Sequence, residues 1–236
     1  MRPVNKGPHP SDVGGRPIVF SKYQDANPHL RNRIGYYCSY CEIEFKYGLA
    51  VEHVVPKNPH TGNPALQLAW DNFLLACPYC NSCKGKTAID VAGYFWPDRD
   101  NTLRAFSYDG SGIVRPLPNL QPLEIALAQS TINLFGLNRS KTTRPKASRR
   151  DERYRFREIA WRTAVEARAD IERNDSEHLR KWITRHSVSI GSFSIWMTVF
   201  KDDVDMKRRL IEAFIGTASN CFDAQCNPIS RLGGRI

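Results

Sequence analysis

Two short stretches decide how this chain folds: Cys-Ser-Tyr-Cys at residues 38–41 and Cys-Pro-Tyr-Cys at residues 77–80. Each Cys-x-x-Cys forms a tight turn that directs two thiolates at one ion, and four thiolates suit a tetrahedral structural zinc. We find no signal peptide and therefore expect a reducing compartment, which argues against disulfides among the seven cysteines. The sequence predicts one zinc ion held by Cys38, Cys41, Cys77 and Cys80.

Candidate catalytic residues lie between these turns and directly after them. Glu52 and His53 precede Val-Val-Pro, Asn72 lies within Trp-Asp-Asn-Phe-Leu, and Asn81 follows the second cysteine pair. A histidine with a pKa of about 6.5 can act as a base at neutral pH, and the oxygens of Glu52 and Asn81 suit Mg²⁺ or Mn²⁺. A lone histidine is more often a surface residue and an asparagine a turn residue. Their spacing within the cysteine frame favours a hydrolytic site.

Residues 37–86 resemble the zinc-stapled HNH endonucleases, whose motif runs acid-His-x-x-Pro, Trp-x-Asn-Leu and Cys-x-x-Cys-Asn-x-x-Lys. The resemblance implies a ββα-metal fold and hydrolysis of phosphodiester bonds. It makes His53 the first motif residue and general base, and Asn72 the second, which braces the loop and orients His53. Asn81 is the third, and Glu52 and Asn81 would hold the catalytic Mg²⁺ or Mn²⁺. Asn81 replaces the histidine of the founding motif, and Glu52 stands where aspartate is frequent.

The charge of the chain favours a polyanionic partner. Its 236 residues include 34 Lys and Arg against 24 Asp and Glu, a net charge of +10. Nine basic and two acidic residues fall within residues 139–157. We expect nucleic acid, DNA or RNA, to be bound through phosphates; a solvated linker is the alternative for this stretch. The residues expected to contact phosphates are Lys84, Lys86, Arg149, Arg150 and Arg153.

The remaining patterns predict an α+β protein in three parts. Residues 1–35 are rich in Pro and Gly and predict an extended N-terminal arm. Residues 36–120 would form the HNH ββα-metal domain, with a β-hairpin at 102–117 around Asp-Gly-Ser-Gly. Residues 121–236 predict a mostly helical region. Helices are expected at about 122–136, 148–173, 179–186 and 210–215.

Short matches outside the motif resemble the HNH subunits of Septu-type anti-phage systems, which are also found beside retrons. They lie at residues 1–6, 37–42 and 131–138 and in the closing helical part. This resemblance implies an ATPase partner with an ABC- or SMC-like head. Because the sequence has no G-x-x-x-x-G-K-[ST] phosphate loop, nucleotide control would come from that partner. The arm and the helical part are expected to form the docking surface.

Two other functions remain open at this point. The chain could be a stand-alone homing or restriction-like HNH nuclease, or a zinc-containing adaptor that binds nucleic acid without cutting it. No apolar run approaches the roughly 20 residues needed to cross a bilayer, so we expect a cytoplasmic protein with no membrane partner.

Overall fold

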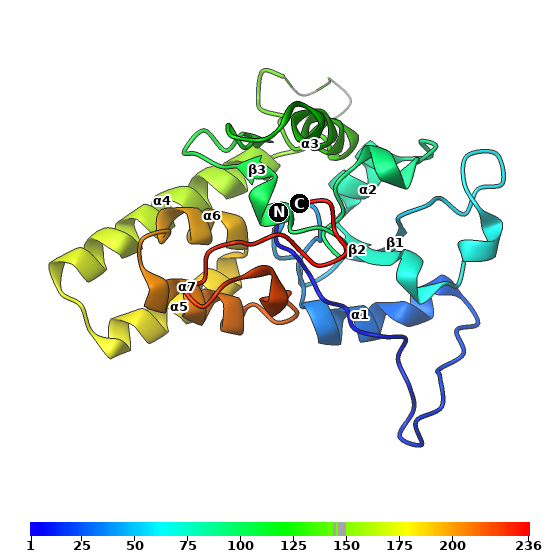
Figure 1. Cartoon of the computed structure of the whole chain (residues 1–236), viewed down its shortest axis with the longest axis horizontal. Helices are drawn as coiled ribbons and strands as arrows, with labels where there is room; N and C mark the ends of the chain where they lie inside the picture. The colour runs from blue at the N-terminus through cyan, green and yellow to red at the C-terminus, as the bar shows by residue number, and fades with distance from the viewer. Residues whose placement is uncertain (144, 146–149) are drawn as a thin grey trace.

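The structure is a computed structural model that describes residues 1–143, 145 and 150–236. Its elements form two parts on either side of the two chain ends (Figure 1). Residues 50–84 belong to one part, residues 153–213 to the other, and the N- and C-terminal residues lie close together between them. Residues 50–84 contain every predicted catalytic residue and two of the four predicted zinc ligands, and Cys38 and Cys41 precede them.

A ββα unit builds the first part. Strand β1 (Ala50–His53) pairs antiparallel with β2 (Phe73–Ala76), which sets His53 opposite Phe73. Helix α2 (Pro78–Lys84) follows at once, and proline is tolerated at its first position because that N–H has no helical partner. The long β1–β2 connection carries the short 3₁₀ helices η2 (Pro64–Leu66) and η3 (Trp70–Asn72). The predicted ββα core is confirmed.

The first 35 residues are not an extended arm. They include η1 (Tyr23–Ala26) and helix α1 (Asn27–Ile34). Met1 and Val4 are buried, and the Arg2 guanidinium donates hydrogen bonds to the carbonyls of Ile34 and Phe214. The Pro/Gly-rich composition concealed these widely spaced anchors. The segment is anchored by contacts within its own chain.

The predicted hairpin is present but short. Strands β3 (Phe106–Ser107) and β4 (Arg115–Pro116) have two residues each, and η5 (Thr102–Arg104) precedes them. The 3₁₀ helix η4 (Val91–Gly93) lies earlier, in the connection between α2 and η5. Helix α3 (Pro122–Phe135) ends at Gly136, whose φ of +59° favours glycine, as its sequence predicts.

Four helices form the second part. They are α4 (Arg153–Arg173), α5 (Glu177–Ile190), α6 (Phe193–Val199) and α7 (Val204–Ala213), with η7 (Ser219–Cys221) after them. Helix α4 packs on α6, and α5 packs on α7. The sequence predicted three of these helices and missed α6, which is buried on nearly all sides and therefore has no polar stripe.

The chain ends join the two parts. Val4 forms a β-bridge with Thr217, Arg231 donates to the carbonyl of Val4 at 3.1 Å, and the N–H of Asn101 donates to the carbonyl of Ile236 at 3.1 Å. Within the described ranges, no helix has both the length and the hydropathy to span a lipid bilayer.

Candidate active site and metal centre

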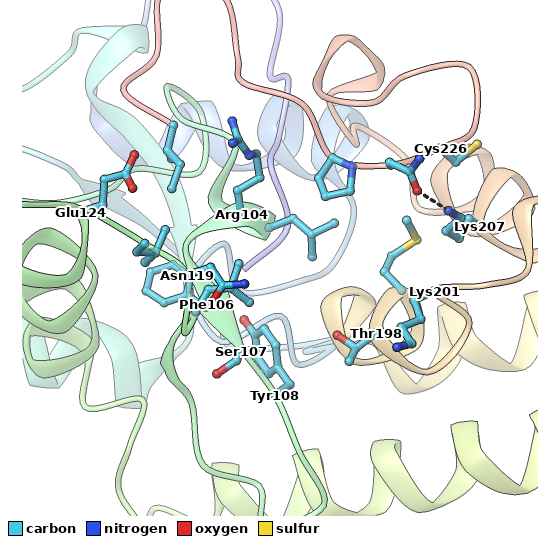
Figure 2. Close-up of a pocket in the computed structure, with 17 residues that line it drawn as sticks. Arg104, Phe106, Ser107, Tyr108, Asn119, Glu124, Thr198, Lys201, Lys207 and Cys226 are labelled. Atoms are coloured by element: carbon cyan, nitrogen blue, oxygen red, sulfur yellow. Dashed lines mark hydrogen bonds between the residues drawn. The ribbon is translucent and has the colours of Figure 1, made fainter. Parts of the chain in front are cut away.

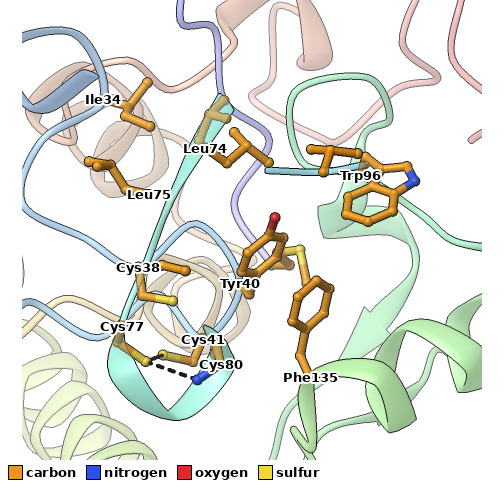
Figure 3. Packing of buried hydrophobic residues seen from close by; sticks show 14 of the residues in the cluster. Ile34, Cys38, Tyr40, Cys41, Leu74, Leu75, Cys77, Cys80, Trp96 and Phe135 are labelled. Atoms are coloured by element: carbon orange, nitrogen blue, oxygen red, sulfur yellow. Dashed lines mark hydrogen bonds between the residues drawn. The ribbon is translucent and has the colours of Figure 1, made fainter. Parts of the chain in front are cut away.

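The four predicted cysteine ligands form one buried cluster (Figure 3). Their Sγ atoms all lie within 4.8 Å of one another, and those of Cys41 and Cys77 are 3.8 Å apart. Four sulfurs about 2.3 Å from one tetrahedral ion lie roughly 3.8 Å from each other, so the geometry fits a four-cysteine structural metal site. Cys83, three residues beyond Cys80, does not belong to the cluster.

An arginine from the helical part closes this cluster. Nη1 of Arg153 donates to Sγ of Cys80 at 2.9 Å and to the carbonyl of Phe135 at 2.9 Å, while Nη2 contacts Asp151 at 2.7 Å. Burial lowers the pKa of Arg153, and the neighbouring Cys80 and Asp151 raise it. Together the neighbours outweigh burial, so the pKa of Arg153 lies above its usual value. With 2% of its surface exposed, Arg153 is unable to reach a nucleic-acid phosphate. The prediction of a phosphate contact by Arg153 is wrong, because the charge run does not distinguish a buried arginine from a solvated one.

Three of the four predicted catalytic residues, Glu52, His53 and Asn81, border one cleft of about 440 Å³. It lies at the junction of β1, the β1–β2 connection and α2. Glu52 and His53 contribute from β1, Asn81 and Lys84 from α2, and Lys86 from the residues after it. Asn72 is not part of the lining.

His53 is held so that one ring nitrogen stays basic. Its Nε2 lies 3.0 Å from the carbonyl oxygen of Gln67. A carbonyl oxygen only accepts hydrogen bonds, so the neutral ring carries its proton on Nε2 and its lone pair on Nδ1. Burial lowers the pKa of His53; the Gln67 carbonyl raises it, and the charges of Lys57 and Lys84 lower it again. The net shift is below the usual value, which keeps the ring neutral and able to accept a proton.

Glu52 points away from His53 into a buried ion pair. Its carboxylate accepts from the Tyr40 hydroxyl and is 2.5 Å from Nζ of Lys84, which also donates to the His53 carbonyl. Glu52 and Lys84 are each 3% exposed. Lys84 therefore neutralises Glu52, and the prediction that it contacts a flanking phosphate is contradicted by this pairing.

The two predicted asparagines have different surroundings. Asn72 is buried; its Oδ1 accepts from Val55 N at 2.8 Å, and its Nδ2 donates to the carbonyls of Val55 and Leu66 at 2.9 and 3.3 Å. These bonds tie together the two ends of the connection that carries Gln67. Asn81 is exposed at the cleft.

The donor atoms at the cleft suit a hard divalent cation. The carboxylate of Glu52 and the amide of Asn81 offer oxygen ligands, and the open cleft leaves room for water, which Mg²⁺ usually retains. Lys84 lies against one Glu52 oxygen, so a cation at that oxygen requires the ammonium to move.

Sequence reasoning missed two neighbours of His53. The Tyr23 ring meets the His53 ring edge-on at 4.9 Å, and Nζ of Lys57 lies 3.9 Å from the centre of the Tyr23 ring. Lys57 directly follows the Glu-His-Val-Val-Pro segment, and its position could have marked it as a cleft residue. Nothing in the sequence marked Tyr23 as a neighbour of His53, because it precedes His53 by thirty positions and belongs to η1.

The remaining basic candidates differ in exposure. Lys86 and Arg150 are exposed. Arg149 lies outside the described residues. Arg157, in the same charge run, is buried and donates to the carbonyls of Gly112 and Leu137. The basic stretch is thus partly structural, and phosphate contacts by Lys86, Arg149 and Arg150 stay predictions.

Comparison with known proteins identifies the segment that holds both sites. Residues 38–87 match the family model of HNH endonucleases. The chain is also similar to a protein of Vibrio cholerae serotype O1 biovar El Tor named "Retron Vc95 putative HNH endonuclease", at 27% identity over 126 residues. This match covers 50% of the chain and 61% of the relative's length. The chain therefore carries an HNH endonuclease domain with a four-cysteine metal site.

Proposed function

We propose that this HNH domain is an active endonuclease that hydrolyses phosphodiester bonds, with DNA as its substrate, in the cytoplasm. The observation that carries the proposal is the cleft lined by His53, Asn81 and Lys57, in which the hydrogen bond of Nε2 to Gln67 leaves Nδ1 of His53 as the basic nitrogen. A buried, oriented imidazole next to positive charge is suited to water attacking an anionic phosphodiester. Zinc is the proposed ion of the four-cysteine site, because thiolates in tetrahedral geometry select it.

In this mechanism His53 takes the proton from the attacking water at Nδ1. The Gln67 carbonyl fixes the ring through Nε2, and Asn72 holds the connection that presents Gln67. Glu52 and Asn81 would hold Mg²⁺ or Mn²⁺, and a bound divalent cation supplies stabilisation of charge on the phosphate and leaving oxygens. Lys86, which is exposed and lies two residues after α2, would contact a neighbouring phosphate.

Cleavage of supercoiled plasmid DNA by the full chain, with Mg²⁺ or Mn²⁺ and with a chelator, tests this function. His53→Ala should lower the rate by about 10² to 10⁴ and leave zinc content and circular dichroism unchanged. His60→Ala is the matched control, since His60 is an exposed histidine in the β1–β2 connection that follows His53. Full activity of His53→Ala would remove the nuclease assignment and favour a non-catalytic adaptor. Single-stranded DNA and RNA substrates in the same assay decide the substrate class.

We further propose that the nuclease serves anti-phage defence together with an ABC- or SMC-like ATPase subunit. The support is the retron context named for the Vibrio cholerae relative and the Septu-like sequence matches. The helical part offers exposed apolar side chains for such a partner, including Phe156 and Ile159 on α4 and Trp182 on α5. Co-expression with an ATPase encoded beside it, followed by size-exclusion chromatography, should give one complex. Separate elution would favour a stand-alone nuclease.

A further inference from the structure

A second cavity lies between the β3–β4 hairpin and helices α6 and α7 (Figure 2). Its volume is about 450 Å³, within the range of about 300–1,000 Å³ typical of small-molecule sites. Residues 226–228 of the C-terminal segment line one side. It shares no lining residue with the active-site cleft or the four-cysteine cluster, so the proposed nuclease function does not account for it. We refer to it as the hairpin cavity.

The walls of the hairpin cavity are mainly apolar, with polar groups at a few positions. Phe106 and Met197 come from β3 and α6. Ser107, Asn119 and Thr198 add hydroxyl and amide groups. A pocket with apolar walls and a few placed polar groups is the usual form of a site for a small organic ligand.

Three cationic side chains border the hairpin cavity, and none of them forms a salt bridge among the described residues. They are Arg104 from η5, Lys201 after α6, and Lys207 from α7. The carboxylate of Glu124 also borders the cavity, but it accepts a hydrogen bond from the backbone N–H of Gln121 at 2.8 Å.

Lys207 gives the strongest evidence for an anion site in the hairpin cavity. It is only 4% exposed, and its ammonium donates to Oδ1 of Asn227 at 2.8 Å (Figure 2). The negative charge of Asp223 acts on Lys207 from a distance, but no carboxylate among the described residues lies within 4.0 Å of the Lys207 ammonium. An ammonium has three N–H donors, and a buried charge is costly unless an opposite charge accompanies it. Lys207 therefore presents a buried positive charge that a bound anion would satisfy.

We propose that the hairpin cavity binds a nucleoside monophosphate, with the phosphate at Lys207 and Lys201 and the base against Phe106 and Met197. A phosphate carries enough negative charge for more than one cation, and Lys and Arg are its usual partners. An aromatic wall accepts the face of any base. Asn119, Ser107 and Thr198 line the same cavity, and their side chains offer hydrogen bonds to a sugar or base edge.

Calorimetric titration of the full-length chain with AMP and TMP tests this proposal, with adenosine and inorganic phosphate as separate probes. We expect saturable binding of both nucleotides, at least tenfold tighter than either fragment. Lys207→Met and Lys201→Gln should each weaken it at least tenfold. Lys201 is exposed, so its replacement leaves the fold intact even if Lys207→Met destabilises it. Arg208→Gln, an exposed neighbour on α7, is the matched control and should bind as the wild type does.

The outcomes separate this proposal from nuclease activity. Lys86→Gln should retain nucleotide binding, because Lys86 belongs to the active-site cleft. Lys201→Gln should still cleave DNA at the wild-type rate. Absence of AMP and TMP binding, or equal binding by wild type and Lys201→Gln, would overturn the proposal. Inorganic phosphate binding as tightly as AMP would also overturn it and leave a simple anion site.

Discussion

The Arg153 guanidinium donates a hydrogen bond to Sγ of Cys80 at 2.9 Å, across 73 positions of sequence. Four thiolates around one dication carry a net charge of −2, so a buried cation beside them offsets part of the excess. The same guanidinium binds Asp151 and the Phe135 carbonyl. The metal centre of the HNH domain and the start of α4 are thus held by one side chain.

Replacing Arg153 should therefore loosen the metal without removing a ligand. We expect Arg153→Met to accelerate zinc transfer to a chromogenic chelator by about 10- to 100-fold, the usual effect of losing a hydrogen bond to a metal ligand. Arg155→Met, an exposed neighbour on α4, should release zinc at the wild-type rate. Equal rates for Arg153→Met and Arg155→Met would mean that the contact does not stabilise the site.

Loss of a ligand should have a larger effect. A structural metal in a small unit contributes on the order of 10 kcal/mol to folding, so Cys77→Ser should give metal-free, misfolded protein by elemental analysis and circular dichroism. Cys83→Ser is the control, because Cys83 lies outside the four-cysteine cluster and should keep one zinc per chain. Well-folded Cys77→Ser protein without metal would contradict a structural role.

The Glu52–Lys84 pair predicts an antagonism between the lysine and a divalent cation. Removing one member of a buried ion pair costs about 3–5 kcal/mol, so Lys84→Met should melt at a lower temperature than the wild type in chelator. Mn²⁺ should then raise its melting temperature more than it raises that of the wild type, because the freed Glu52 carboxylate gains a counter-ion. Lys86→Met should behave as the wild type in this melting assay. Equal Mn²⁺ shifts in all three proteins would show that Lys84 does not compete with the cation.

Substitution of Asn72 should affect stability, whereas substitution of Asn81 should affect the Mg²⁺ dependence of cleavage. Asn72→Ala leaves partly buried backbone groups of Val55 without partners and should reduce the free energy of unfolding by about 1 kcal/mol in urea titrations. Asn81→Ala changes an exposed side chain, so stability should be unchanged while the Mg²⁺ concentration for half-maximal cleavage rises. The reverse pattern would exchange the two roles.

Arg149 and Arg150 should act through phosphates alone. Arg149→Gln and Arg150→Gln together should reduce the slope of log K against log salt by about two and weaken binding equally for all DNA sequences. Replacing the paired, exposed Arg173 with Gln provides a control for lost positive charge elsewhere on the helical part. An unchanged slope in the double variant would assign residues 149–150 to another role.

The sequence predicted the elements whose signals are local. The cysteine pairs and α3 each depend on residues that are close in sequence, such as the Pro122 and Gly136 boundaries of α3, whereas the ββα core followed from the family resemblance. His53, Glu52 and Asn81 could be placed at one cleft because the family motif fixes their order.

The missed features depend on contacts between distant segments. Arg153 and Lys84 read as surface cations in the sequence, yet each is buried because an anionic group from elsewhere in the chain lies beside it. The Gln67 carbonyl is a backbone atom, so no side-chain motif could reveal its bond to His53. Helix α6 lacked an amphipathic period because both of its faces are covered.

The joining of the two chain ends has a consequence for biosynthesis. The cysteine cluster spans residues 38–80 and can form once that segment has left the ribosome. The Val4 N–H already finds the Pro97 carbonyl, but its β-bridge to Thr217 and its hydrogen bond from Arg231 form only when those residues emerge, more than two hundred residues later. Domains begin to fold as they are made, whereas contacts between distant segments come last. A nascent chain can therefore hold its metal early, while the packing behind the catalytic unit is completed only after residue 231 has been translated.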